Sequence, residues 1–315
     1  MAGLRSLGVR RSLLWRSLGR RGREELMSED IIRDFFICVG AQKAGTTWLA
    51  RILSDHPDVF ITPVKEIHYF DYMRGITQHL SEQKRASRHR KYHQRLWTQW
   101  HKFAFHRAQW AWYRDYMKRP IDDAWYVSLF KNRGGKRFAG EATPEYAIIG
   151  KEGYEHIKRL SPEVRILFIL RNPVTRAWSQ ALHHCRATDM DATRMSRDQL
   201  IEHMEGAPHF NELGSYMETI ESLEAVFAPD QLKFMFYEAI HNDRLTGLAE
   251  ICRFIGAGFS PSLFPELTRR FNTSQDVKLP DDVRQHLSAK YRPLAARVRD
   301  RLGEVPESWV REFAL

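Results

Sequence analysis

The strongest constraint on the fold is the stretch GAQKAGTTWL at residues 40–49, which directly follows the apolar run FFICV at 35–39. A strand that enters a glycine turn and then a helix presents backbone N–H groups at the helix N-terminus, where they bind anions. The common phosphate-binding loop of this kind reads G-x-x-x-x-G-K-[ST]. Here both glycines keep their spacing, but Thr46 occupies the lysine position and Lys43 lies inside the loop. The pattern predicts a phosphate site of a different kind.

The residues around this loop support that prediction. The backbone N–H groups of Ala44 to Thr47 are expected to point at a bound anion, and Thr46 and Thr47 add hydroxyl donors. A helix is expected over 46–55, with Trp48 on its apolar face. A tight strand-to-helix turn with an incidental lysine is the structural alternative. The combination of strand, glycine turn, lysine, paired threonines and helix favours the phosphate site.

Short apolar runs alternate with amphipathic segments along the 315-residue chain, as in α/β proteins. We expect a P-loop-like three-layer sandwich, with a central, mostly parallel sheet flanked by helices. The expected strands are 35–39, 164–170 and 232–236, with weaker candidates at 58–62 and 137–140. The expected helices are 46–55, 152–160, 173–187, 211–228, 243–255 and 281–302, the last with a break at Pro293.

A second cationic site is predicted after another strand. Arg171 ends the run VRILFIL at 164–170, and Asn172-Pro173 opens the next helix. Kinases and NTPases of the P-loop type need an acid near a strand end to hold magnesium, whereas this chain has an arginine there. Both departures argue against a kinase, which stays open as the alternative enzyme. Two cationic sites indicate a nucleotide with phosphate on both sides of its ribose.

Together, GAQKAGTTWL and RNPVTRAWSQ at 171–180 resemble the sulfotransferases that use 3′-phosphoadenosine-5′-phosphosulfate (PAPS). The resemblance covers about residues 35–256 and implies an enzyme that moves a sulfuryl group from PAPS to a hydroxyl or amine, without a metal. In that family the first motif holds the 5′-phosphosulfate and the second holds the 3′-phosphate. The implied donor-binding residues are Lys43, Ala44, Gly45, Thr46 and Thr47 at the 5′-phosphate, Trp48 near the adenine, and Arg171 with Ser179 at the 3′-phosphate.

The resemblance also suggests which residues do the chemistry. Lys43 inside the loop is expected to neutralise charge on the bridging oxygen as the sulfuryl group leaves. The stretch PVKEIHYFDY at 63–72 resembles the K-E-x-H-F-F-D-W motif of the heparan sulfate sulfotransferase branch, whose proposed base matches Glu66. His68 is the rival, since the small-molecule branch uses histidine. If the two strands are neighbours, Lys43 and Glu66 face one crevice at the carboxyl edge of the sheet.

The acceptor is less well specified than the donor. The branch motif E-K-S-P-x-Y has a lysine at the position that is Ala142 here, which places heparan sulfate in doubt as acceptor. We expect a small-molecule or glycan acceptor. Three cysteines without paired spacing indicate a reducing, cytoplasmic compartment. No transmembrane segment is predicted, and the sequence carries no signal for an oligomeric state.

The positive charge of the chain is local. The net charge is +10, and residues 84–114 hold nine Lys or Arg and no acid. We expect one domain at 31–315 with a helical, basic and aromatic insertion at about 73–135, whose aromatics are mostly core and whose basic residues face the acceptor. The same mixture occurs in nucleic-acid and membrane-surface binders, the non-enzyme alternative, although no nucleic acid is expected.

Residues 1–30 are expected to be a disordered basic extension. Their arginine-rich composition is that of a mitochondrial-type presequence. The alternative is that Met27 is the true start of the chain. Either way the first buried strand is expected to begin close to Ile32, downstream of this segment.

Overall fold

The computed structural model describes residues 31–98, 103–206, 208–267 and 277–315. Its centre is a five-stranded, wholly parallel sheet in the order β2-β3-β1-β4-β5. The prediction of a mostly parallel sheet flanked by helices is confirmed. The strands are β1 (Phe35–Gly40), β2 (Val59–Ile61), β3 (Phe138–Ala142), β4 (Arg165–Leu170) and β5 (Leu232–Phe236).

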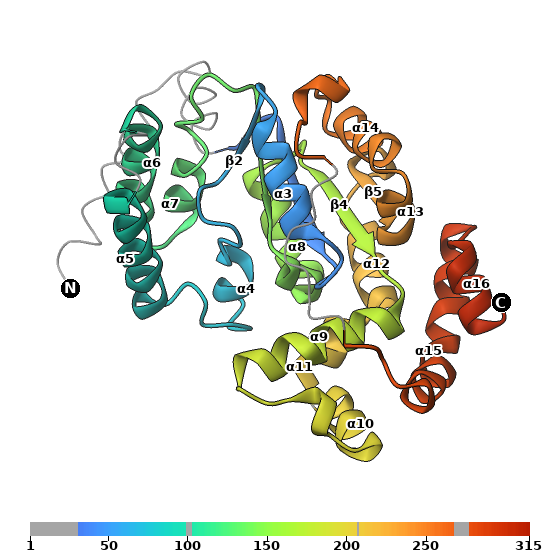
Figure 1. The fold of residues 1–315 in the computed structure, drawn as a ribbon. Coiled ribbons are helices and arrows are strands. Elements are labelled where there is room, and N and C mark those ends of the chain that lie inside the picture. Colours follow the sequence, from blue (N-terminus) through green and yellow to red (C-terminus); the bar gives the residue numbers. More distant parts are fainter. Residues whose placement is uncertain (1–30, 99–102, 207, 268–276) are drawn as a thin grey trace.

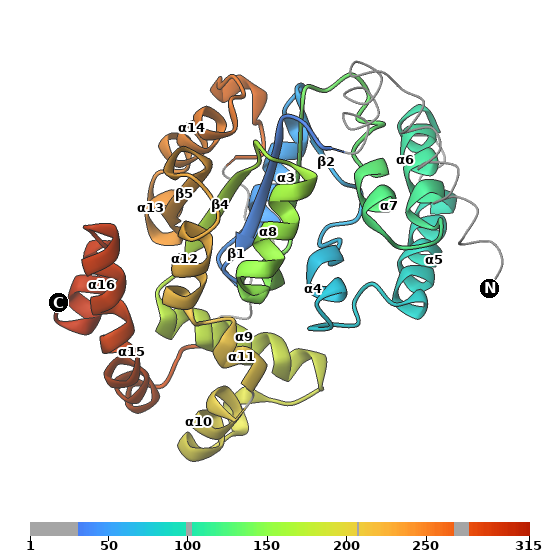
Figure 2. The same ribbon diagram turned by 180° about the vertical axis from the view of Figure 1, so that it is seen from behind.

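Helices cover both faces of the sheet, with α3 on one side and α8 and α12 on the other (Figures 1 and 2). This explains why the strands are continuous apolar runs: β1 is buried along all six of its residues. Because all five strands are parallel, the loops that follow them meet at one edge of the sheet. The predicted donor and acceptor residues lie in those loops.

The helices agree with the predicted ones where the apolar pattern is long, and two predictions were wrong. The segment expected as one helix at 211–228 holds the end of a short helix at 208–212 and a second helix at 216–224, because the chain turns at Gly214 between them. The last long helix runs through Pro293 without the predicted break. The helices are α3 (Thr46–Asp55), α4 (Tyr69–Met73), α5 (Glu82–Thr98), α6 (Phe103–Tyr116), α7 (Asp123–Ser128), α8 (Gly150–Leu160), α9 (Pro173–Ala187), α10 (Arg197–Glu205), α11 (Pro208–Glu212), α12 (Tyr216–Glu224), α13 (Tyr237–Asn242), α14 (Arg244–Ile255), α15 (Asp281–Leu302) and α16 (Glu307–Phe313), with 3₁₀ turns η2 (Pro144–Ile148), η3 (Ala192–Arg194), η4 (Pro229–Gln231) and η5 (Pro261–Leu263).

The segment 73–135 forms the helical layer α5 to α7 beside β2 (Figure 1). Its described aromatic residues are largely core, since Trp112, Tyr116 and Trp125 are buried. Arg85 is also buried: it donates to the carbonyl oxygens of Tyr116 and Lys118 and lies 5.4 Å from the Tyr116 ring. The expected core role is met by most of the aromatics that the structure describes, whereas Trp110 is 51% exposed. The predictions for 1–30 and for the side chains of 95–108 lie outside the described residues.

Two observations bear on the expected location. Among the residues that the structure describes, no helix combines the length and the apolar character that crossing a bilayer requires. Cys38, Cys185 and Cys252 are all buried free thiols. A reducing compartment stays a prediction.

Candidate active site

The predicted donor loop lies between β1 and α3, at the edge of the sheet where the strands end. Lys43 and Gly45 have left-handed backbone angles, with φ of 69° and 80°. A Cβ at Gly45 would lie 3.1 Å from His241 Nε2 and 3.2 Å from Tyr237 Cε2, so glycine suits this position in two ways. Gly45 is also the N-cap of α3 and supplies no side chain to cap the first turn. An anion can accept the N–H groups left there.

Arg171 connects the two predicted phosphate sites. Its Nη1 donates to the carbonyl oxygen of Lys43 at 2.7 Å, and its Nε donates to Thr175 Oγ1 at 3.1 Å. The Tyr216 hydroxyl in turn donates to the Arg171 carbonyl oxygen at 2.7 Å. Ser179 is half-buried two turns into α9. The motif after β4 is therefore held directly against the motif after β1.

The charge of Lys43 is sensitive to what binds beside it. Burial lowers the pKa of its ammonium group to about 8, and the positive charges of Arg186 and Arg171 push it in the same direction. The negative charge of Glu66 opposes them. A bound phosphosulfate would compensate these repulsions, so the structure favours an anion at this loop.

Aromatic side chains from α13 cover the start of α3. The rings of Trp48 and His241 are 5.1 Å apart, those of Tyr237 and His241 are 4.1 Å apart, and Arg171 Cζ lies 4.7 Å from the centre of the Tyr237 ring. Burial, with the charges of Arg244 and Arg171, lowers the pKa of His241 to about 4. His241 is thus a neutral ring at physiological pH. The sequence analysis missed this residue, although it follows the aromatic end of β5.

Glu66 and His68 lie in the loop between β2 and α4, and both have an unusual backbone. Their φ angles are 61° and 62°, in the left-handed region that residues other than glycine rarely adopt. Six non-glycine residues of the described chain have positive φ, and three of them are the predicted catalytic residues, Lys43, Glu66 and His68. Such strain often collects at functional sites, because the surrounding structure must hold it in place.

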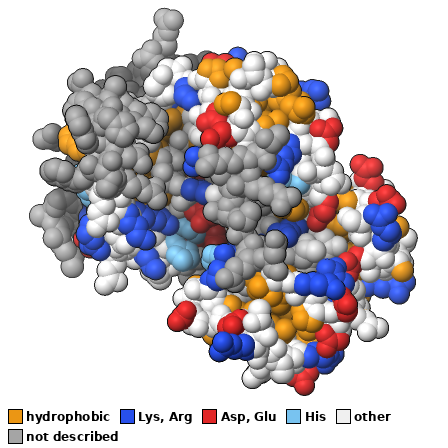
Figure 3. Space-filling view, in the orientation of Figure 1, with side chains coloured by type: hydrophobic (Ala, Val, Ile, Leu, Met, Phe, Trp, Pro, Cys, Tyr) orange, Lys and Arg blue, Asp and Glu red, His pale blue; other side chains and the backbone are white. Residues whose placement is uncertain are grey.

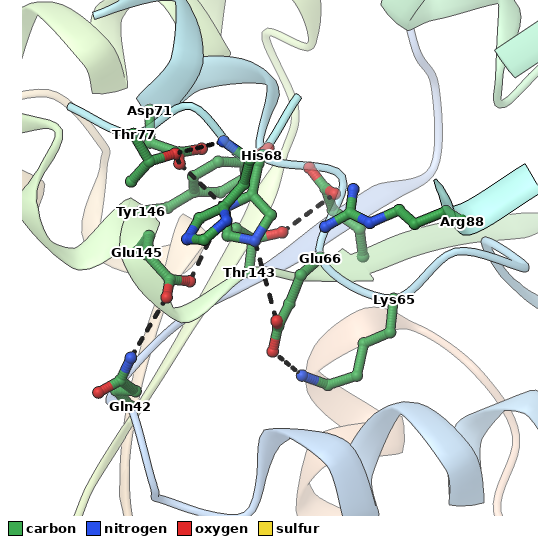
Figure 4. A network of polar contacts seen from close by, with 12 residues as sticks. Gln42, Lys65, Glu66, His68, Asp71, Thr77, Arg88, Thr143, Glu145 and Tyr146 are labelled. Carbon is green, nitrogen blue, oxygen red and sulfur yellow. Dashed lines mark hydrogen bonds and ion pairs between the residues drawn. The ribbon is translucent and has the colours of Figure 1, made fainter. Parts of the chain in front are cut away.

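His68 lies at the centre of an acidic cluster (Figure 4). Its Nδ1 is 2.9 Å from Asp71 Oδ2 and 3.9 Å from Glu145 Oε2, and its Nε2 is 3.8 Å from Glu66 Oε2. Lys65 binds the other carboxylate oxygen of Glu66. Asp71, which the sequence placed near these two residues, is fully buried.

The neighbouring charges determine whether Glu66 or His68 is protonated at neutral pH. The hydrogen bond with Asp71 and the nearby carboxylate of Glu66 outweigh the effect of burial and raise the pKa of His68 to about 9. Burial alone would raise the pKa of Glu66, but the nearby His68 ring and the bound, charged Lys65 outweigh it and hold the pKa of Glu66 well below its usual range. At neutral pH Glu66 is a carboxylate that can take up a proton, whereas His68 already carries one.

The strand order corrects one step of the sequence argument. β1 and β2 are not neighbours, because β3 pairs with both of them. Lys43 and Glu66 still lie close enough for their charges to interact. The intervening β3 ends in two further acids: Glu141, whose pKa burial raises to about 7, and Glu145 just beyond the strand. Tyr126 donates to Glu141 at 2.5 Å.

Two connections were missed from the sequence. Gln42 of the donor loop donates through Nε2 to Glu145 Oε1 at 3.2 Å, which joins the two halves of the site. On α9, the charge of Arg186 lowers the pKa of Lys43, and the charge of Lys43 lowers the pKa of His183. The helical spacing of His183 and Arg186 from Ser179, four and seven residues on, was a signal for this shared face.

The described surface adds a cationic border to the site. Lys84, Arg90 and Lys91 are exposed on α5, and Arg88 is half-buried and donates to the Tyr116 hydroxyl at 3.1 Å. Figure 3 shows Lys and Arg side chains gathered over α5, beside histidine and acidic side chains. The charges of Arg88 and Lys84 both act on the pKa of His79, whose ring lies 4.5 Å from that of His68.

Comparison with known proteins agrees with this geometry. The model of the sulfotransferase family matches residues 35–261, which include every residue placed in the site above. The chain belongs to the sulfotransferase family. The prediction of that family from the two phosphate motifs is confirmed.

The relatives and a solved structure define how far the likeness extends. Human heparan sulfate glucosamine 3-O-sulfotransferase 6 is 28% identical over 145 residues, which cover 45% of this chain and 28% of the relative. Human bifunctional heparan sulfate N-deacetylase/N-sulfotransferase 3 is 24% identical over 318 residues, which cover 88% of this chain and 31% of the relative. The chain thus spans less than a third of the length of these curated relatives.

The likeness in fold extends over most of the chain. A crystal structure of a sulfotransferase from Alicyclobacillus acidocaldarius superimposes with a TM-score of 0.59 at 23% identity, over 89% of this chain and 99% of that one. It shares the fold of the sheet and its flanking helices.

Proposed function

We propose that this chain transfers a sulfuryl group from PAPS to a hydroxyl or amine of an acceptor. The observation that carries the proposal is the hydrogen bond from Arg171 to the Lys43 carbonyl, which joins two cationic loops into one site beside the Glu66 carboxylate. A donor with phosphate on both sides of its ribose matches two joined anion sites. A kinase fits less well, because β4 is followed by Arg171 and not by an acid that would hold magnesium.

Each predicted donor residue takes a defined part in this proposal. Lys43 and the N–H groups from Ala44 to Thr47 bind the 5′-phosphosulfate, with the Thr46 and Thr47 hydroxyls as further donors. Arg171 and Ser179 bind the 3′-phosphate. The Trp48 ring, with Tyr237 and His241 next to it, borders the adenine. No metal takes part in the transfer.

Glu66 acts as the general base in the proposed reaction. The bond from sulfur to the bridging oxygen of the 5′-phosphate breaks while the acceptor oxygen binds sulfur and gives its proton to Glu66. Lys43 stabilises the charge that develops on the leaving oxygen. Because His68 already carries a proton, Glu66 is the group of this pair that is free to accept one, and His68 is assigned the part of orienting the acceptor.

We propose a carbohydrate as the acceptor class. The names of the relatives refer to heparan sulfate, and the exposed basic residues of α5 suit an anionic chain. The lysine of the branch motif is absent at Ala142, so the particular glycan is not carried over. A cytoplasmic location, predicted from the cysteines, remains a prediction.

Titration calorimetry with adenosine 3′,5′-bisphosphate tests the donor site directly. We expect binding with one nucleotide per chain, unchanged by EDTA, and much weaker binding of AMP, which lacks the 3′-phosphate. Equal affinity for the two nucleotides, or a requirement for magnesium, would refute the PAPS assignment. Transfer of labelled sulfate from PAPS to pools of glycans, phenols and amines then identifies the acceptor.

A further inference from the structure

The acidic cluster around His68 contains an oxygen atom that needs a partner. The Glu145 side chain is 91% buried and points into the cluster (Figure 4). Its Oε2 atom accepts no hydrogen bond from the described residues. A buried carboxylate oxygen without a donor is costly, and native structures usually satisfy such groups with a proton donor or a cation. The atom therefore points to a ligand of positive charge.

Three side chains can supply ligand atoms for a metal ion at this place. One ligand atom each from Glu66, His68 and Glu145 lies within 4.8 Å of the other two. Because Zn–N and Zn–O bonds are about 2.0–2.2 Å long, the three atoms would close by roughly 1–1.5 Å around an ion, which side-chain rotation can provide. Imidazole together with carboxylates is a ligand set of divalent transition metals, and the ion would displace the proton from His68 Nε2 into solvent.

The groups around these three side chains are arranged as supports for metal ligands. His68 Nδ1 is engaged by the Asp71 carboxylate at 2.9 Å, which leaves Nε2 on the side of Glu66. A carboxylate behind a histidine in this way orients metal-binding imidazoles. Thr77 donates to the same Asp71 oxygen, and Gln42 donates to Glu145 Oε1 at 3.2 Å, which leaves Oε2 for the ion.

We propose that Glu66, His68 and Glu145 form a binding site for a divalent transition-metal ion, with Asp71 and Gln42 as supporting residues. Lys65 holds the other oxygen of Glu66 and does not occupy the ligand atom. If Glu66 is the base, as proposed above, an ion on its carboxylate removes the lone pair that accepts the acceptor proton. The ion then inhibits transfer in competition with the acceptor and not with the donor.

The test is calorimetry with ZnCl₂ on the full chain, stripped of metal by a chelator and dialysed. We expect one zinc ion per chain. Glu145→Gln should weaken binding at least about tenfold, and Asp71→Asn should weaken it about 10- to 100-fold, the effect typical of supporting residues. Co²⁺ absorption provides a second readout, because its visible bands report the same ligands.

Control variants separate this site from other places where a histidine lies close to a second possible zinc ligand. His89 and His93 on α5 have Nε2 atoms 3.0 Å apart, and His286 lies 2.8 Å from Glu205, so His89→Gln and His286→Gln test whether zinc binds there. Both variants should bind zinc like the parent. Loss of zinc binding in a control variant would overturn the proposal. The proposal would also be overturned if Glu145→Gln and Asp71→Asn proteins melt at the parental temperature and bind zinc as tightly as the parent.

The binding test does not depend on sulfate transfer. A chain that binds zinc as expected but transfers no sulfate refutes the proposed function and leaves the metal site standing. An active chain that binds no zinc refutes the metal site alone. If Glu145→Gln does not fold, Asp71→Asn and the Co²⁺ spectrum of the parent chain decide.

Discussion

The two halves of the candidate site lie at one edge of one sheet, yet they are built in opposite ways. The donor half, after β1 and β4, consists of backbone N–H groups and the cations Lys43 and Arg171. The acceptor half, after β2 and β3, gathers Glu66, Asp71 and Glu145 around one histidine. The first is preorganised for an anion and the second for a proton or a cation. Sulfuryl transfer needs both, because negative charge leaves toward one side and a proton leaves toward the other.

The largest effect is expected from the acceptor half. Glu66→Gln removes the proposed base at nearly constant shape, so kcat should fall by about 10²- to 10⁴-fold, the usual contribution of general-base catalysis. Affinity for adenosine 3′,5′-bisphosphate should hold, because the donor half is untouched. Steady-state kinetics and calorimetry measure the two.

His68→Asn is the control for the choice of base. It should cost less than Glu66→Gln, since His68 already carries a proton at neutral pH. A dead His68→Asn enzyme beside a nearly normal Glu66→Gln enzyme would reverse the assignment of the two residues.

The donor half should respond differently when its lysine is removed. Lys43→Met is expected to lower kcat by about 10²- to 10³-fold, the typical cost of losing one stabilising group at a developing negative charge. Donor affinity should fall too, because the ammonium also binds the ground-state phosphate. A loss of acceptor affinity alone would show that Lys43 serves the other half.

Gly45 tests the shape of the donor loop apart from its charge. Gly45→Ala forces a side chain into a left-handed backbone within 3.2 Å of Tyr237, at a cost of about 1–3 kcal/mol. Donor affinity or the free energy of unfolding should fall by that amount, as calorimetry and denaturant titration measure. Gly303→Ala, also at positive φ but in open space, is the matched control for backbone strain alone.

A smaller effect is expected on the pH dependence of the activity. The charge of Lys65 lowers the pKa of Glu66, so Lys65→Met should raise that pKa and move the acid limb of kcat/KM to higher pH by about one unit. The parent, whose Glu66 stays ionised to lower pH, should keep its activity further into acid. Lys151→Met, at an exposed lysine 3.9 Å from Glu155, should leave the profile in place. If the pH dependence of kcat/KM is unchanged in Lys65→Met, Lys65 does not control the protonation of Glu66.

The smallest expected effect lies at the rim. Replacing Arg88, Arg90 and Lys91 together by glutamine should raise the acceptor KM severalfold and leave donor affinity unchanged, because Arg88 acts electrostatically on His79 next to His68 and the other two are exposed on the same helix. If neither quantity moves, the basic residues of α5 form a solvated face and the proposed anionic acceptor loses its main support.

The donor half could be predicted from the sequence because its parts are contiguous. The glycine turn, Lys43 and the start of α3 follow one another directly, so local geometry brings them together. Arg171 is distant in sequence, but its place after a buried strand put it at the same edge. Family membership followed from these two motifs.

The helix predictions show the same dependence on local pattern. Where an apolar face repeats over many residues, as at 281–302, the bounds agree with the structure. Where the chain turns after a few residues, as at 208–215, the pattern misled, because it does not show that Gly214 lies against Arg176 of α9, where a side chain would not fit. Short helices such as α10 and α13 carry too few residues for a period to show.

The sequence by itself determined the sheet, the donor loop and the candidates Lys43, Glu66 and His68, because strand-turn-helix patterns and strand ends are local properties. The tertiary structure decided that β3 separates β1 from β2 and brings Glu145 against His68. It also decided which of the two candidate bases carries a proton. That state depends on how deeply residues 65–71 are buried and on the charge of Glu145, which comes from a distant part of the chain, and the local pattern of residues contains neither.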